Sequence, residues 1–391
     1  MHRLAIRSNN IKAAEPRLNT LFLVVCLLSI FGLLMMTSAS VEIANSQYDD
    51  PFYFFKRQGI YTLMGLSVMA ITLQIPIVVW QRLSLILLMG SFLLLILVLV
   101  PGVGKVVNGS SRWIDLGFFN LQPSELAKIF IVIYLASYLD GNLENVKRTW
   151  FGFLKPILIV GAAAVLLQLE PDHGALVILM LTAFCLIFLA GAKLYRFFPI
   201  LFLCASLIFY LAMAKSYVIV RFSSYLNPWA AENVYGGGYQ LTQALIAFGR
   251  GEWFGVGLGN SIQKLYFLPE AHNDFVLAII GEELGLVGVS AIVLLFCLLV
   301  YLAFSIGRSA EKKELLFKSF LAYGIGLLFA GQALINIGVN TGLLPTKGLT
   351  LPFLSYGGAS LIISFFMASL LLRIQYETEC FDAKLQSEKN R

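Results

Sequence analysis

Asp274 stands at the boundary between a long hydrophilic stretch, residues 215–274, and the apolar run that follows it. It closes the sequence Leu-Pro-Glu-Ala-His-Asn-Asp-Phe at 268–275. An ionisable side chain at a membrane boundary is costly to place, so it marks a candidate functional site. A carboxylate there could accept a proton from a hydroxyl group. The structural alternative is a helix cap, because aspartate is a favoured N-cap residue.

A second set of charged residues lies just before and at the start of the apolar run 124–139. Pro123 predicts a helix start, which places Glu125 in the first turn, where a carboxylate is favoured. Glu125 and Lys128 are three residues apart, so they share a helix face and can form an ion pair. Such a pair either lines a polar cavity or locks two helices together. Arg112, next to a tryptophan, is either a cavity residue or an interfacial anchor.

The segment 239–249 has apolar residues at helical spacing and predicts a short amphipathic helix along the membrane. Gln243 lies on its polar flank, and Arg250 follows directly. Glu282 lies eight positions after Asp274, about 12 Å along the same face if one helix is continuous there. We therefore regard Gln243, Arg250 and Glu282 as candidate substrate-binding residues.

Residues 343–358 form an interrupted segment. Pro345 and Pro352 break any helix, and the glycines permit tight backbone turns. Broken backbone at membrane depth is tolerated where it is buried in protein or lines a wet cavity. Packing explains the glycines but gives no reason for Lys347, which we add to the candidate substrate-binding residues.

The histidines form no catalytic triad. His173 and His272 are the histidines beyond residue 2, and a lone histidine is weak evidence for a metal. We predict no metal ligands from these side chains, keep His272 as a substrate-binding candidate, and leave a divalent cation open as a cofactor. Carboxylates and cations on one side of a membrane suit group transfer on an anionic lipid. A carboxylate then accepts a hydroxyl proton while cations stabilise a departing phosphate.

Membrane helices must hold these residues. The chain is 59% hydrophobic and 13% charged, whereas soluble domains carry about 25% charged residues. Ten apolar runs approach the ~20 residues of a spanning helix. We predict an all-α polytopic membrane protein with ten transmembrane helices and a large extracytoplasmic loop, 215–274, between helices 7 and 8. The predicted spans are 20–40, 58–76, 83–100, 124–139, 155–169, 173–190, 197–214, 275–305, 318–341 and 352–373.

Basic residues predict the orientation. They favour one side by about two to one, and this side becomes cytoplasmic. It holds both the N-terminal segment 1–19 and the charged tail 374–391. Anionic lipid explains the net charge of +6 without a nucleic-acid partner. The five cysteines show no spacing for a disulfide or a metal.

Taken together, these segments resemble the SEDS family (shape, elongation, division and sporulation), the bacterial peptidoglycan polymerases of the FtsW and RodA type. The likeness covers about residues 37–376. Gly-Tyr-Gln-Leu-Thr-Gln (238–243) and Pro-Thr-Lys-Gly-Leu-Thr-Leu-Pro-Phe (345–353) resemble the division branch, of the FtsW type, more than the elongation branch. The densest segments are 108–128, 239–285 and 343–360.

The resemblance implies a single SEDS-type transmembrane domain over 1–391 with ten helices. It implies a glycosyltransferase that polymerises lipid II on the outer face of the bacterial cytoplasmic (inner) membrane, at the division septum. Its partners would be a class B penicillin-binding protein as septal transpeptidase and other division-complex proteins. The family's essential acid falls on Asp274, as general base for the acceptor's 4-hydroxyl. The cations that we consider for stabilising the undecaprenyl pyrophosphate leaving group are Arg112, Lys128, Arg250 and Lys347.

Three alternatives stay open. A lipid II flippase would need a polar path through the whole bilayer, whereas the polar residues here cluster on the predicted outer side. A RodA-like elongation polymerase fits the wording less well, and a scaffold would make Asp274 merely structural. Asn273, Ala359 and His173 depart from the family's usual residues at positions that concern the detail of the outer cavity.

Overall fold

The computed structural model describes residues 15–107, 110–117, 119–200, 202, 206 and 224–389. The chain is predominantly helical, with a small sheet at one end. The long helices are α2 (Glu15–Tyr48), α3 (Tyr53–Gln74), α5 (Ser84–Leu99), α6 (Pro123–Arg148), α7 (Trp150–Leu169), α8 (His173–Leu189), α13 (Val276–Glu311), α14 (Leu316–Asn340) and α15 (Gly358–Lys389). The shorter helices are α4 (Ile77–Arg82), α11 (Ala231–Val234) and α12 (Tyr239–Gly251), with single turns at Leu194–Arg196 and Gln263–Phe267.

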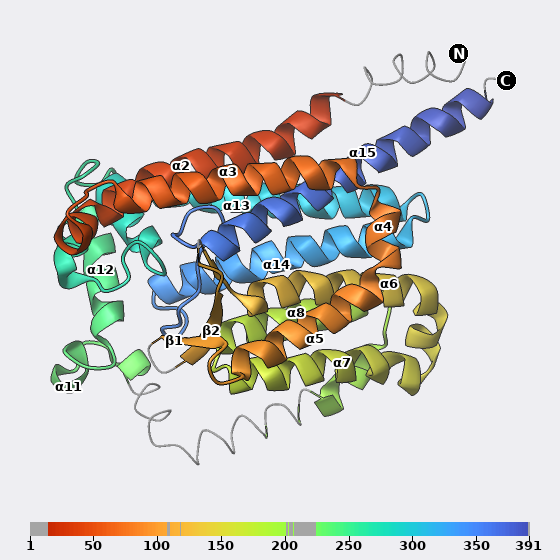
Figure 1. The fold of residues 1–391 in the computed structure, drawn as a ribbon, viewed down its shortest axis with the longest axis horizontal. Helices are drawn as coiled ribbons and strands as arrows, with labels where there is room; N and C mark the ends of the chain where they lie inside the picture. The colour runs from red at the N-terminus through yellow and green to blue at the C-terminus, as the bar shows by residue number, and fades with distance from the viewer. Residues whose placement is uncertain are drawn as a thin grey trace.

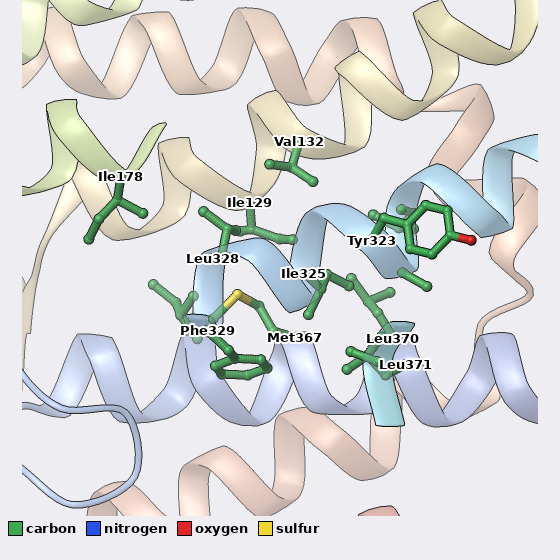
Figure 2. Close-up of a cluster of buried hydrophobic side chains, with 14 of the residues drawn as sticks. Ile129, Val132, Ile178, Tyr323, Ile325, Leu328, Phe329, Met367, Leu370 and Leu371 are labelled. Atoms are coloured by element: carbon green, nitrogen blue, oxygen red, sulfur yellow. The ribbon is translucent and has the colours of Figure 1, made fainter. Parts of the chain in front are cut away.

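The long helices form one bundle, with α14 and α15 in its interior (Figure 1). Apolar side chains fill the core between these helices and also cover their outer faces, where lipid would contact them. Figure 2 shows part of this core, where side chains of α6, α8, α14 and α15 pack together. The side chains include Ile129 and Val132 of α6, Ile178 of α8, Ile325, Leu328 and Phe329 of α14, and Met367, Leu370 and Leu371 of α15.

Each long helix overlaps a predicted span, and within the described residues six are long and apolar enough to cross a membrane. The helices α5 and α8 are apolar but shorter. The predicted span 197–214 lies mainly outside the described residues, so the total of ten remains a prediction. Helix α6 runs well past residue 139, where the predicted span ended. The apolar pattern did not predict its last turns because they are polar. Helix α15 continues to Lys389 through much of the predicted tail 374–391.

The prediction of an all-α protein was wrong in one respect. Strands β1 (Gly104–Val107), β2 (Ser110–Asp115) and β3 (Asn120–Leu121) form an antiparallel sheet in the order β1-β2-β3. The signal was present, because Asn-Gly between β-branched and polar residues is a strong hairpin sequence. Strands this short were hidden beside spans of about 20 residues.

One end of the bundle carries most of the segments outside the long helices, although α4 lies toward the other end (Figure 1). In Figure 1 the sheet, α11 and α12 lie at this end, whereas the start of α2 and the end of α15 lie at the other end. The predicted loop 215–274 is described from residue 224 onward and contains α11 and α12. The expected amphipathic helix at 239–249 is confirmed as α12. Irregular backbone between α14 and α15 confirms the break predicted at 343–358.

Candidate active site

A cavity of about 620 Å³ opens among these end segments. Its walls come from α3, the sheet, the start of α6, the turn between α7 and α8, residues 270–275 and residues 346–360. Such a volume suits the polar head of a substrate. The ionisable residues that line it include Arg57, Arg112, Glu125, Asp172, Glu270, Asp274 and Lys347.

Asp274 is held by its main chain, while its side chain lines the cavity. Its carbonyl oxygen accepts hydrogen bonds from Asn336 Nδ2 at 2.9 Å and Asn340 Nδ2 at 3.0 Å, both on α14. Asn336 Nδ2 also donates to the carbonyl oxygen of Leu349 at 2.6 Å. Helix α13 begins after Phe275 at its N-cap, without a side-chain cap bond. The helix-cap alternative for Asp274 is therefore wrong.

The segment between α14 and α15 approaches the Asp274 carboxylate closely. A Cβ atom at residue 348 would lie 2.7 Å from Asp274 Oδ2, so only glycine fits there without a shift. Lys347, the preceding residue, is half-buried and lines the same cavity. The interrupted backbone thus brings a cation and the carboxylate to one cavity.

The surroundings of Asp274 raise its pKa to about 7. Burial is the largest cause, because a buried carboxylate loses solvation by water. The Glu270 carboxylate raises the pKa further, and the Arg112 guanidinium lowers it. A carboxyl group with a pKa near neutrality can take up and release protons at physiological pH.

Arg112 on β2 is held by neutral groups. Its Nε donates to the carbonyl oxygen of Glu170 at 3.4 Å and its Nη2 to that of Pro171. The carboxyl of Glu170 is fully buried, and neither oxygen has a hydrogen-bond partner. Burial and then the Asp172 carboxylate raise the pKa of Glu170 to about 8, although Arg112 opposes them. Glu170 is therefore largely neutral at pH 7, and the Arg112 charge remains available to the cavity.

The predicted Glu125–Lys128 ion pair is confirmed. Lys128 Nζ lies 2.8 Å from Glu125 Oε1, and both side chains are buried. Gln332 Nε2 of α14 donates to Glu125 Oε2 at 3.3 Å, so the pair also joins two helices. Glu125 lines the cavity, whereas Lys128 lies behind it. Both interpretations of the pair thus hold in part.

Arg250 and Glu282 bind each other away from the cavity. Arg250 Nη1 lies 2.6 Å from Glu282 Oε1. The fully buried Glu282 carboxylate also accepts from the backbone nitrogens of Ile262 at 3.0 Å and Gln263 at 3.2 Å. Because Asp274 lies before the first turn of α13, the assumed continuous helix from 274 to 282 does not exist. This carboxylate fastens the segment after α12 to α13.

His272 and Gln243 also lie outside the cavity lining. The buried His272 ring packs against Phe54 and Tyr356, with centroids 4.8 and 5.9 Å apart. Burial lowers the pKa of His272, so its ring is neutral at pH 7. Gln240, one turn before Gln243 on α12, lines the cavity instead. The amphipathic pattern identified the helix but selected the wrong glutamine for its cavity side.

Several lining residues were missed by sequence reasoning. Asp172 caps α8 by accepting from Ala175 N at 3.1 Å, and it accepts from Ser124 Oγ at 2.7 Å. Its signal was an acid just before an apolar run, the same pattern that identified Asp274. Neither Arg57 nor Glu270 was predicted from the sequence as a cavity residue. Within the described ranges, no three histidine, cysteine or acidic side chains gather as a metal site.

The model of the FtsW/RodA/SpoVE family, described as cell cycle protein, matches residues 18–380. The chain belongs to this family. The six long apolar helices found among the described residues and this membership make it a multi-pass membrane protein. The SEDS resemblance of the sequence is thereby confirmed.

Relatives in the family carry informative names. A probable peptidoglycan glycosyltransferase FtsW of Coxiella burnetii is 51% identical over 360 residues, which cover 92% of this chain and 96% of the relative. A protein of the same name from Pseudomonas fluorescens is 50% identical over 347 residues, covering 89% of this chain and 85% of the relative.

Solved structures share the fold. A chain from a peptidoglycan synthase complex, studied for the coordination of polymerization and crosslinking, has a TM-score of 0.75 and 27% identity. The alignment covers 92% of this chain and 97% of that chain. The rod shape determining protein RodA of Thermus thermophilus has a TM-score of 0.65 and 26% identity, over 92% of this chain and 96% of that chain.

Proposed function

We propose that this protein is a peptidoglycan glycosyltransferase that polymerises lipid II, with Asp274 as the general base. The observation that carries the proposal is the Asp274 carboxyl, which lines a polar cavity and has a pKa of about 7. FtsW relatives at about 50% identity support the substrate class. The lower identity to RodA favours septal synthesis in division over elongation.

The reaction joins two lipid-linked sugars. The acceptor's 4-hydroxyl gives its proton to the Asp274 carboxylate while its oxygen bonds to the donor's anomeric carbon. The bond from that carbon to the diphosphate oxygen breaks, and its electron pair leaves with undecaprenyl pyrophosphate. Arg112 and Lys347 line the cavity and would stabilise this charge. Lys128 and Arg250 are held in ion pairs outside the cavity lining, so we do not assign them this role.

The membrane arrangement follows from the two ends of the bundle. We place the cavity at the outer leaflet and both termini in the cytoplasm, with ten helices across the inner membrane. The cavity end lies opposite the start of α2 and the end of α15, which supports this orientation. A class B penicillin-binding protein is the proposed partner, supported by the likeness to a chain of a peptidoglycan synthase complex. Other division proteins and membrane lipid complete the expected contacts.

The test separates an enzyme from a flippase. The purified protein, with its transpeptidase partner blocked by a β-lactam, is given labelled lipid II, and glycan strands are resolved by gel. We expect the protein to make polymer. In vesicles, we expect lipid II to cross the membrane no faster with the protein than without it. Translocation without polymer would instead favour the flippase. The position of the cavity at one end of the bundle argues against a flippase.

A further inference from the structure

Arg57 is a cavity cation that sequence reasoning left without a role. It lies in the first turns of α3, is half-buried and lines the cavity. Its Nη1 donates to the Tyr53 hydroxyl at 2.9 Å, and its guanidinium carbon lies 5.5 Å from the Tyr53 ring centroid. The adjacent Lys56 is paired with Asp50 at 2.7 Å. Within the described part of the chain, no carboxylate lies within 4.0 Å of the Arg57 guanidinium.

Aromatic side chains fix the surroundings of Arg57. Tyr53 stacks on Tyr48 with ring centroids 3.8 Å apart. Tyr61 and Tyr356, whose centroids are 6.3 Å apart, line the cavity together with Arg57. These neutral groups orient the guanidinium without neutralising its charge. A half-buried cation in such a setting is suited to an anionic ligand. A guanidinium can donate two parallel hydrogen bonds to two oxygens of one phosphate.

Arg57 and Arg112 belong to different walls of the cavity. Arg57 lies on α3, which packs against α15 and α2, whereas Arg112 lies on β2, which packs against α5 and α6. The charges of Arg112 and Glu270 act on the Asp274 carboxyl. Arg112 is therefore the arginine whose charge acts on the Asp274 carboxyl, and Arg57 lies on a different set of supporting elements.

A polymerase holds two lipid-linked sugars at once, and each carries a diphosphate. The donor's diphosphate is attached to the carbon under attack, so it lies near Asp274, on the far side of that carbon from the attacking hydroxyl. The acceptor presents its 4-hydroxyl to Asp274 and carries its own diphosphate at the other end of its disaccharide. The two diphosphates therefore need separate cationic positions.

We infer that Arg57, with Tyr61 and Tyr356, forms a second anion subsite that holds the diphosphate of the acceptor lipid. Arg112 and Lys347 then face the diphosphate that leaves the donor. This inference rests on the proposed function and adds the assignment of acceptor and donor within its cavity. It makes Arg57 a residue for acceptor binding, separate from the chemistry at Asp274.

The kinetic test uses the full chain with its blocked transpeptidase partner and varies the lipid II concentration. We expect Arg57→Gln to raise KM for lipid II about tenfold or more, because a charge-assisted bond to phosphate is lost. Its kcat should stay within about twofold, since proton transfer at Asp274 is unchanged. Arg57→Lys should restore part of the affinity. The matched control is Lys56→Gln, which removes the adjacent cation outside the cavity and should leave KM unchanged.

A binding test keeps the inference separate from the proposed function. Lipid II binding is measured in nanodiscs with Asp274→Asn, alone and combined with Arg57→Gln or Lys56→Gln. We expect Arg57→Gln to weaken binding and Lys56→Gln to leave it unchanged. Failure of the wild type to polymerise would overturn the proposed function, while this assay still reads the subsite. The subsite is wrong if folded Arg57→Gln and Arg57→Lys both bind lipid II like the control, or if Arg57→Gln lowers only kcat.

Discussion

At the scale of single residues, the Asp274 carboxyl is set between opposing influences. Burial and Glu270 raise its pKa to about 7, while Arg112 limits the rise. An ordinary aspartate near pKa 3.9 would be a far weaker base, since each pKa unit corresponds to about 1.4 kcal/mol. The raised pKa lets the carboxylate accept a hydroxyl proton and still be deprotonated in much of the protein at neutral pH.

The pH dependence of polymerisation should therefore follow Asp274. We expect kcat/KM to rise as pH passes through about 7 and then to level, because the base works deprotonated. Glu270→Gln removes a negative neighbour, lowers the pKa and should move the rise to lower pH. Arg112→Gln removes a positive neighbour and should move it to higher pH. Initial rates across pH check this, and a rise that stays in place in both variants would contradict it.

At the scale of elements, α14 and the segment after it position the carboxylate. Asn336 joins the Asp274 and Leu349 carbonyl groups, so one amide sets the distance between two cavity walls. The backbone at Gly348 then lies against Asp274 Oδ2. The position of the base thus depends on Asn336 and on a broken segment, which follow it by more than 60 residues.

Gly348→Ala should displace the carboxylate while leaving the fold intact. Its Cβ atom would lie 2.7 Å from Asp274 Oδ2, and a misplacement near 1 Å costs roughly a hundredfold in rate. Gly249→Ala is the control, because its Cβ atom would meet nothing within 4 Å and Gly249 does not line the cavity. Turnover of both variants, with unfolding temperatures in detergent, checks this. Equal activity in the two variants would sink the argument.

A second element-scale feature is the fastening of the segment after α12 to α13. Val256 N and Gly257 N donate to the carbonyl oxygens of Glu282 and Glu283, each at 3.0 Å. The Glu283 side chain binds Lys264 Nζ at 2.7 Å. Two buried carboxylates next to each other thus serve structure, which explains why they lie outside the cavity.

Gly285→Ala should weaken this fastening. Gly285 has φ +66° and ψ −165°, a region open to glycine, and a Cβ atom there would collide with the backbone of Gly255. The backbone strain alone should lower the free energy of unfolding by about 1–3 kcal/mol. Gly249→Ala, whose Cβ atom would meet nothing within 4 Å, should leave stability equal or slightly higher. Denaturant titration in detergent compares them, and an equally stable Gly285→Ala would refute the prediction.

At the scale of the whole molecule, the sequence predicted the helices better than their meeting points. Lipid requires long apolar runs, so the spans were readable, whereas polar helix ends and short strands were not. Charge and side of the membrane could not separate Arg250 and Glu282, which bind each other, from Arg112, which lines the cavity. Spacing along one segment predicted the Glu125–Lys128 pair because both residues share a helix. Arg57, Arg112 and Lys347 line one cavity although they lie far apart in the sequence, so their proximity could be seen only in the folded structure.

The central claim is that Asp274 is the general base of polymerisation and is not needed for folding or for lipid II binding. It is tested by glycan-strand synthesis from labelled lipid II, comparing wild type, Asp274→Asn and Gly249→Ala with the same blocked partner. Asparagine keeps the shape of the side chain but cannot accept the hydroxyl proton, so a loss of at least ~100-fold is expected. Unchanged lipid II binding and unfolding temperature should accompany that loss, while Gly249→Ala stays active. Polymer from folded Asp274→Asn at the wild-type rate would contradict the account.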